Sequence, residues 1–330
     1  MRATALAALG VLVAACDSGA STVGSAPSST GLTATERETE ASTRPPGVPA
    51  PTAGPSSSSS GSAPSATAST TSSAPRYAGP SGGCPEDMVT VAGAYCPDVA
   101  QTCLEHAKEW QVESRRLSKL KEKGESGRTT ASERCVRYES PSRCLSKARR
   151  QMRFCIDRYE WPNRAGELPS LLVDWYEARR SCESVGKRLC TEDEFNFACE
   201  GEEMLPYSYG FERAPETCHL DKPYRKRESG LKRYARCVAD PACKAELEVL
   251  DQREPAGSRP ECHSPFGVFD INGNVNEWVE LPGKKPPDRS GLKGGWWGPV
   301  RSRCRPTVTF HKESDFGYEV GFRCCKDASQ

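Results

Sequence analysis

The distribution of apolar positions divides the chain into a polar front part and a folded remainder. Residues 17–82 consist mainly of Ser, Thr, Ala, Pro and Gly and contain almost no aromatic or large aliphatic side chain. Such a composition buries too little apolar area to offset the entropy lost on ordering. We therefore predict a disordered linker within residues 16–82 and one folded domain over 83–330.

Apolar periodicity within the domain predicts a few short elements. Met-Val-Thr-Val at 88–91 indicates a first strand, and the segment FCIDRYEWP at 154–162 indicates another that ends at its proline. Trp175, Ala178 and Cys182 are spaced three and four apart and share one face of a predicted helix.

A second helix is predicted by its capping residues. Thr191 is followed three positions later by Glu194, the pattern of a capping box. This helix turns Cys199 inward, as the first helix does Cys182. A core-facing position suits a disulfide better than a reactive thiolate, which needs exposure and positive surroundings.

Two stretches of the domain differ in character from the rest. Residues 97–153 are charged and mostly helix-forming. We expect a solvated helical insertion there. A basic patch for an acidic partner is the alternative, which the interspersed Glu residues disfavour. Residues 218–254 form a second insertion, in which Pro241 interrupts any continuous helix.

The start of the chain has the layout of an export signal. The basic Met1-Arg2 precedes an apolar stretch over 3–15 that is too short to span a bilayer. It ends in Val-Ala-Ala-Cys, which resembles the lipobox of bacterial lipoproteins. We predict a signal peptide over 1–15 and a lipid on Cys16 that anchors the domain to a membrane of the bacterial cell envelope, outside the cytoplasm. A secretory signal with a chance cysteine is the alternative.

Cysteine usage agrees with export. The chain has 17 cysteines, and the 16 that remain after Cys16 lie between 84 and 325. An even number in an oxidising compartment indicates disulfides, up to eight in this case.

Charge and histidine spacing argue against two function classes, nucleic-acid-binding proteins and enzymes with a metal held by a histidine motif. A formal net charge of +1 is too balanced to indicate nucleic acid as a partner. The four histidines are isolated from one another and offer no H-E-x-x-H or similar metal-binding spacing.

Six segments occur in the order and approximate spacing of one known family. They are FCIDRYE, WYEARRSCESVGKRLCTEDEFNFACEG, PYSYG, GVFDINGNVNEWVE, KGGWW and GFRC. Together they resemble the formylglycine-generating enzyme, or sulfatase-modifying factor, family. The resemblance implies an α+β, C-type-lectin-like fold that is loop-rich and disulfide-rich.

Active members of that family oxidise a sulfatase cysteine to formylglycine with copper and oxygen. Their catalytic pair is two cysteines five positions apart, just after a Gly-Gly. Here Cys304 is the one cysteine between Gly295 and Cys324, and Pro299 stands where the first of the pair is expected. One thiolate cannot complete a two-thiolate copper site, so copper is not expected.

Cys304 aligns with the family in two ways. Counted from Gly295, it falls at the second catalytic cysteine. Counted back from Cys324, it falls near a disulfide cysteine of some members. The second alignment implies the pairs Cys182–Cys324 and Cys199–Cys304. Sequence leaves the other partners open, and Cys325 is an alternative to its neighbour.

The family resemblance also implies a structural calcium ion. Its carried-over ligands are Asn274, Val275 and Glu277, and hard oxygen ligands suit calcium. A polar turn capped by Asn side chains is the alternative.

Two function hypotheses remain. The favoured one is a lipid-anchored, non-catalytic module that binds an exported protein or peptide in the family's substrate cleft. The other is an oxidase of the formylglycine-generating type acting on an exported protein, with Cys304 as the only catalytic candidate. The resemblance places five residues in or beside the cleft, although paired tryptophans are often plain core: Trp296, Trp297, Arg301, Arg303 and Arg305.

Overall fold

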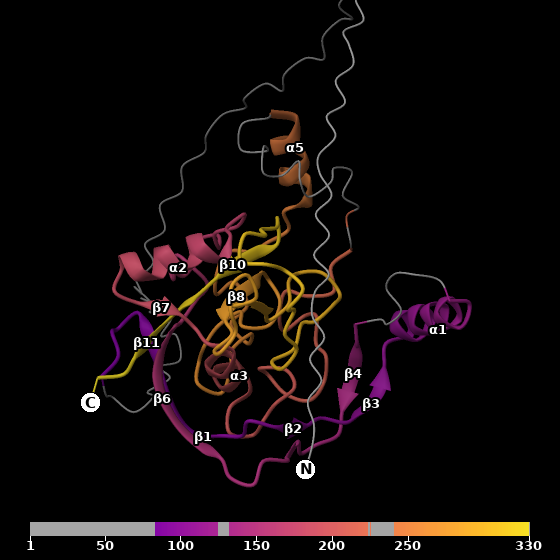
Figure 1. Cartoon of the computed structure of the whole chain (residues 1–330), viewed down its shortest axis with the longest axis horizontal. Coiled ribbons are helices and arrows are strands. Elements are labelled where there is room, and N and C mark those ends of the chain that lie inside the picture. The colour runs from indigo at the N-terminus through magenta and orange to yellow at the C-terminus, as the bar shows by residue number, and fades with distance from the viewer. Residues whose placement is uncertain (1–82, 125–131, 224, 226–240, 330) are drawn as a thin grey trace, which may run out of the picture. The chain divides into compact units, whose positions relative to one another are not determined.

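The computed structural model describes residues 83–124, 132–223, 225 and 241–329 (Figure 1). The predicted signal peptide, the lipid site at Cys16 and the linker lie outside these residues. Described helices and strands are short and joined by long loops, so the domain is α+β and loop-rich. No described helix has the length and hydropathy needed to cross a membrane.

The main sheet has four strands in the order β1-β6-β11-β7. β1 (Met88–Tyr95) and β6 (Arg150–Asp157) pair antiparallel along their whole length, as Figure 1 shows. β11 (Cys324–Asp327) and β7 (Arg188–Leu189) complete the sheet. The strand predicted to end at Pro162 therefore ends earlier and begins earlier, because β1 supplies its hydrogen bonds from residue 150 onward.

A second sheet has the order β10-β8-β9. β8 (Asn276–Glu280) lies in the middle, parallel to β10 (Val320–Phe322) and antiparallel to β9 (Ser290–Lys293). All of its residues but the last of β8 are buried, so it lies inside the domain.

Two helices pack beside the sheets. α2 (Trp175–Ser184) buries Trp175, Ala178 and Cys182, as its periodicity predicts. α3 (Glu192–Glu200) begins with the predicted capping box, in which Thr191 Oγ1 accepts from Glu194 N.

The first insertion is less helical than predicted. It contains one helix, α1 (Lys108–Glu122), and two small antiparallel pairs. These pairs are β2 (Val99–Ala100) with β5 (Arg143–Cys144), and β3 (Cys103–His106) with β4 (Cys135–Tyr138). The Cys103–Cys135 disulfide joins β3 to β4, and the Cys96–Cys144 disulfide joins β5 to the residues before β2. Helix-forming composition alone could not predict these strand pairs.

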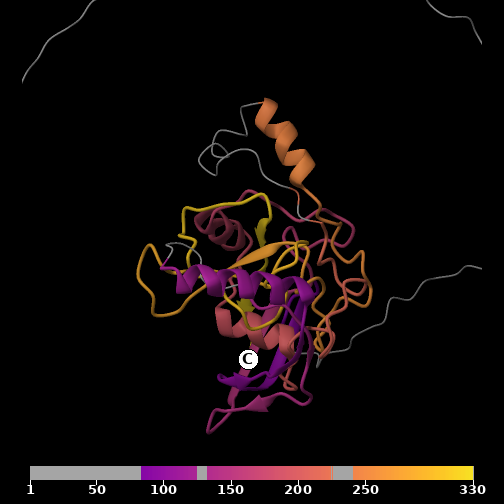
Figure 2. The same ribbon diagram turned by 90° about the vertical axis from the view of Figure 1, so that its right-hand side faces the viewer.

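The second insertion contains α5 (Pro241–Leu250), which begins at the predicted helix-interrupting proline. Figure 2 shows α5 extending from the rest of the domain. Its last turn is joined to the core, where Leu247 and Leu250 contact a cluster that includes Trp296 and Trp297.

Seven disulfides hold the described part of the chain together. They include both pairs implied by the family resemblance. The pairs are Cys84–Cys155, Cys96–Cys144, Cys103–Cys135, Cys182–Cys324, Cys190–Cys325, Cys199–Cys304 and Cys218–Cys262. Bridges of such long separation each contribute about 2–4 kcal/mol, mainly by restricting the unfolded chain.

Candidate functional site

Cys304 lies in the core as half of a disulfide. Its sulfur is 2.05 Å from that of Cys199, and both residues are fully buried. Its backbone N–H donates to Pro206 O at 3.0 Å, which fixes the loop against the 205–209 segment. Cys304 therefore forms the disulfide that the second alignment implies and offers no free thiol.

The position of the first catalytic cysteine is also without a sulfur ligand. Pro299 stands there, and its carbonyl oxygen accepts from Arg213 Nη2 at 3.2 Å. All 14 cysteines whose side chains the structure describes are paired. None of these 14 cysteines is therefore a thiolate that could bind copper.

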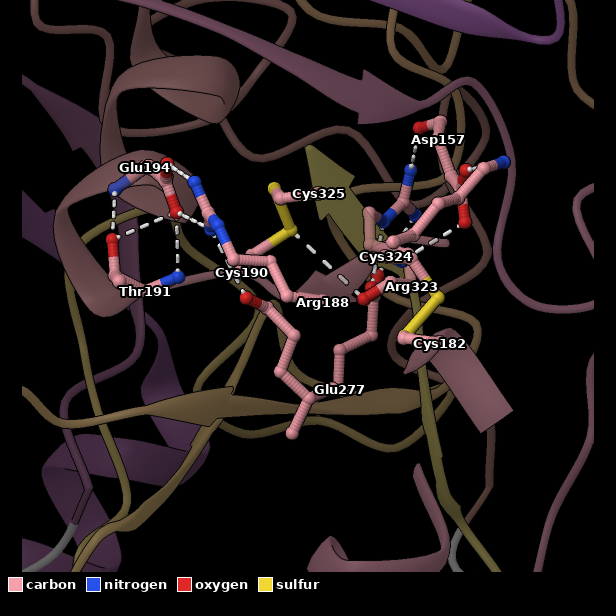
Figure 3. Close-up of a disulfide and its surroundings, with 12 residues drawn as sticks. Asp157, Cys182, Arg188, Cys190, Thr191, Glu194, Glu277, Arg323, Cys324 and Cys325 are labelled. Atoms are coloured by element: carbon pink, nitrogen blue, oxygen red, sulfur yellow. Dashed lines mark hydrogen bonds and ion pairs between the residues drawn. A yellow bond between two sulfur atoms is a disulfide. The ribbon is translucent and has the colours of Figure 1, made fainter. Parts of the chain in front are cut away.

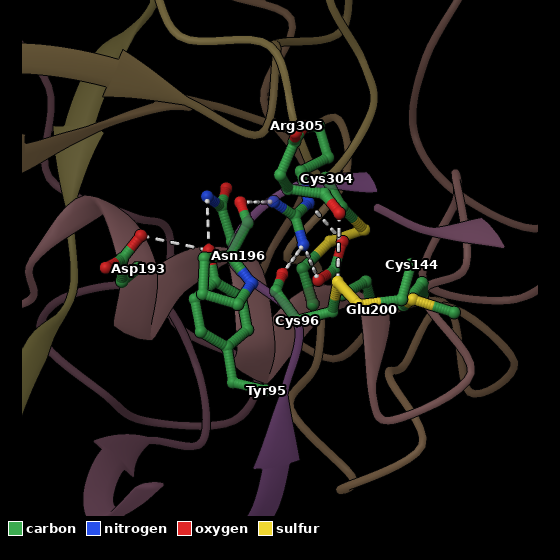
Figure 4. A network of polar contacts seen from close by, with 12 residues as sticks. Tyr95, Cys96, Cys144, Asp193, Asn196, Glu200, Cys304 and Arg305 are labelled. Carbon is green, nitrogen blue, oxygen red and sulfur yellow. Dashed lines mark hydrogen bonds and ion pairs between the residues drawn. A yellow bond between two sulfur atoms is a disulfide. The ribbon is translucent and has the colours of Figure 1, made fainter. Parts of the chain in front are cut away.

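A polar network surrounds the Cys199–Cys304 disulfide (Figure 4). Arg305 Nε donates to Glu200 Oε2 at 2.6 Å, and its Nη2 contacts the other carboxylate oxygen of Glu200. The same guanidinium donates to Cys96 O at 2.6 Å and to Pro97 O at 2.9 Å. Arg305 thus joins the end of α3 to the start of the first insertion.

Burial dominates the proton affinity of two groups in this network. It raises the pKa of Glu200 to about 7, although the contact with Arg305 lowers that pKa. It lowers the pKa of Lys293 to about 7. Lys293 Nζ donates to Arg305 O at 2.8 Å and to Thr307 Oγ1 at 3.1 Å, and the residue is 1% exposed. An external substrate cannot reach such an amine without rearrangement, so its role here is structural.

The residues expected in or beside the cleft make contacts within the domain. Trp296 and Trp297 are buried in a cluster with Tyr318, which fits the alternative that the pair is plain core. Arg303 pairs with Glu133 at 2.8 Å and also donates to Tyr138 Oη.

Two further arginines from that set also have intramolecular roles. Arg305 holds the network described above. Arg301 is half-buried and lies 5.9 Å from the ring centroid of Phe310. The tryptophans are core residues because the end of α5 covers them, which local sequence could not reveal.

The side chains of two implied calcium ligands, Asn274 and Glu277, are engaged with protein groups, and Figure 3 shows Glu277 with Arg323. Both oxygens of Glu277 accept from Arg323, at 2.6 Å from Nε and 2.8 Å from Nη2. Asn274 Oδ1 accepts from Glu254 N at 2.9 Å. The guanidinium of Arg323 already supplies the positive charge beside Glu277. Asn274 and Glu277 therefore fit a calcium site only if the ion displaces that guanidinium.

Sequence reasoning missed the partners of these residues. Arg323 is fully buried and belongs to the GFRC segment. An arginine between two apolar residues could have indicated a buried acidic partner. Asn274 Nδ2 donates to Glu160 Oε2 at 2.8 Å, and Val275 N donates to the other oxygen at 3.3 Å. Burial raises the pKa of Glu160 well above its usual value. The contacts of Asn274 fit the alternative of a polar turn capped by Asn side chains.

One group of side chains has the composition of a metal site. Ligand atoms of Cys103, His106 and Glu133 lie within 4.8 Å of one another. The sulfur of Cys103 is bonded to Cys135, so it is not a thiolate, and Glu133 is paired with Arg303. In this disulfide-bonded state the group lacks the anionic sulfur that soft metals prefer.

The chain is similar in sequence to known proteins. The family model "Sulfatase-modifying factor enzyme 1-like domain" matches residues 129–328. A bovine (Bos taurus) protein named inactive C-alpha-formylglycine-generating enzyme 2 is 27% identical over 193 residues, covering 53% of this chain and 58% of that protein. Its Mus musculus counterpart is 27% identical over 173 residues, covering 50% and 51%. The chain thus spans a little more than half the length of these relatives.

Two solved structures have a similar arrangement. CarF aligns with a TM-score of 0.44 at 14% identity, covering 74% of this chain and 99% of that one. PvdO from Pseudomonas aeruginosa aligns with a TM-score of 0.43 at 17% identity, covering 73% and 94%.

Proposed function

The chain belongs to the family of sulfatase-modifying factor enzyme 1-like domains, and from this premise we propose that it is a non-catalytic binding module. The module is exported and held at a membrane of the bacterial cell envelope by a lipid on Cys16. Its partner is an exported protein or peptide.

The state of Cys304 carries the proposal. The pair Cys199–Cys304 is buried, and Pro299 occupies the other expected ligand position. Copper bound by two thiolates needs two free sulfurs, and none of the 14 cysteines with described side chains offers one. The names of both mammalian relatives contain the word inactive, which agrees with this proposal.

Export is supported by the density of disulfides. Seven bridges among the described residues are typical of an oxidising compartment and rare in a reducing one. The lipid anchor rests on the Val-Ala-Ala-Cys sequence at 13–16.

Copper binding and peptide oxidation test the proposal. Purified full chain, with its disulfides intact, is titrated with Cu(I) against a competing chelator and then incubated with a cysteine-containing sulfatase-type peptide in air. We expect no stoichiometric high-affinity copper and no aldehyde product. Uptake of one Cu(I) per chain together with aldehyde formation would show that the oxidase alternative is right.

A further inference from the structure

Two adjoining pockets form a groove whose walls include the neighbours of Cys218 and Cys262, Thr217 and Glu261. One pocket has a volume of about 580 Å³ and the other about 520 Å³. They share Thr217 and Glu261 in their walls, so they adjoin each other. We call this the 217–261 groove. Its lining consists of Glu203, Leu205, Ser208, Tyr209, Glu216, Thr217, Glu254, Ser258, Arg259, Pro260, Glu261, His263, Ser264 and Pro265.

The walls of the 217–261 groove are acidic. They contain four carboxylates against one guanidinium, that of Arg259. Arg259 is already neutralised by Glu254, with contacts of 2.6 Å and 2.8 Å. Glu203 and Glu261 are exposed and form no ion pair within the described part of the chain. The groove therefore presents uncompensated negative charge.

The groove is also held in a fixed shape. Cys218 and Cys262 are bonded beneath it, and both are fully buried. Arg259 Nη1 donates to Glu216 O at 3.0 Å, which ties one wall to the other. Rigid walls lower the entropy that a ligand must offset on binding.

Ser208 supplies a separate indication of a ligand. It lines the groove, is 2% exposed, and its Oγ has no hydrogen-bond partner. Its backbone N–H donates to Asn272 Oδ1 at 2.7 Å, which fixes its position. A buried hydroxyl without a partner costs about 1–3 kcal/mol, a cost that a polar ligand group would relieve.

An aromatic wall completes the site. Tyr209 lines the groove and stacks on Tyr207 at 5.5 Å between ring centroids. A flat aromatic face favours the aliphatic stem and the cation of a lysine or arginine side chain.

We propose that the 217–261 groove binds an extended, lysine- or arginine-bearing segment of an exported protein. The inference rests on the proposed function, because it identifies the partner of that binding module. Glu203 and Glu261 attract the cations, Tyr209 supports their stems, and Ser208 hydrogen-bonds to the segment.

Fluorescence anisotropy with defined peptides tests the inference. The full chain is titrated into a labelled peptide of alternating lysine and glycine, and into a peptide of equal length with serine in place of lysine. We expect binding of the lysine peptide alone, weakened by salt. Glu203→Gln/Glu261→Gln is expected to weaken it about 3- to 10-fold. Ser208→Ala is expected to weaken it about threefold without lowering the Tm of the free chain, because the variant removes a hydroxyl that has no partner there.

A matched variant separates the groove from general charge. Glu86→Gln/Glu212→Gln removes two exposed carboxylates that do not line the groove, and we expect it to bind as the unaltered chain does. Equal weakening by both double variants, or equal binding of both peptides, overturns the inference. Neither result bears on the copper measurement, so the two proposals fail separately.

Discussion

Burial changes the proton affinity of Glu200 beside the Cys199–Cys304 disulfide. The pKa of Glu200 is about 7 in the folded chain against a usual value of 4.5. The folded state therefore holds a proton that the unfolded state has already released between these pH values. By linkage, this group makes the folded state less stable as pH rises through that window.

We predict that Glu200→Gln reduces the pH dependence of stability. In the unaltered chain, Glu200 lowers the free energy of unfolding by up to about 3 kcal/mol between pH 4.5 and pH 7. Urea unfolding across this window measures the slope. The exposed Glu212→Gln variant is expected to keep the slope of the unaltered chain. An unchanged slope in Glu200→Gln would contradict the assignment.

We predict that calcium leaves the Tm unchanged. Arg323 already binds both oxygens of Glu277, and Glu254 N occupies Asn274 Oδ1. Calorimetry of the full chain with calcium and with a chelator measures this. A calcium-dependent rise in Tm that Glu277→Gln abolishes would show instead that the family's ion displaces the guanidinium.

Replacing Arg323 alone is expected to destabilise the folded chain. Arg323→Met leaves the buried carboxylate of Glu277 without a cation, and we predict a loss of about 3–5 kcal/mol of unfolding free energy. Glu277→Gln/Arg323→Met should recover part of that loss in urea unfolding. A single variant as stable as the unaltered chain would rule out the pairing as a stabilising contact.

The sequence predicted the partners and burial of some residues but not of others. The Cys182–Cys324 and Cys199–Cys304 pairs were implied by the family resemblance and are present. Local sequence could not decide between cleft and core for Trp296 and Trp297, because the α5 residues in their cluster are far away in sequence. The acidic 217–261 groove was missed for the same reason, since its walls come from separate segments.

At the scale of elements, α3 links β7 to the loop that carries Cys304. Its capping box starts beside β7, and its last turn carries Cys199 and Glu200. The disulfide to Cys304 closes a separation of 105 residues. Through these contacts, α3 fixes the loop that carries Cys304.

We predict that Cys199→Ala/Cys304→Ala lowers the free energy of unfolding by about 2–5 kcal/mol. The reason is the loss of the constraint that this bridge places on the unfolded chain. Urea unfolding under non-reducing conditions, followed by tryptophan fluorescence, measures the loss. If this variant were as stable as the unaltered chain, the bridge would not be the constraint described here.

Element prediction succeeded where periodicity and caps were strong. α2 and α3 were predicted from three-and-four spacing and from a capping box. The two-residue strands β2, β5 and β7 were not, because two residues carry no period. Their positions depend on partner strands and disulfides distant in sequence.

At the scale of the whole molecule, the fold followed from six segments in family order and not from any one element.

The proposed membrane anchor rests on sequence alone. We predict that the full chain enters the detergent phase on temperature-induced phase separation, and that Cys16→Ser moves it to the aqueous phase because it loses its acyl chains. Ser18→Ala is the matched control and should stay with detergent. A Cys16→Ser variant that also stays there would refute the anchor.

The central claim is that Cys304 is structural, which removes the family's copper chemistry. A non-reducing peptide map of the alkylated full chain tests it most directly. We predict a linked peptide pair containing Cys199 and Cys304 and no alkylated Cys304. Alkylated Cys304 in most molecules would contradict the claim and restore the oxidase alternative.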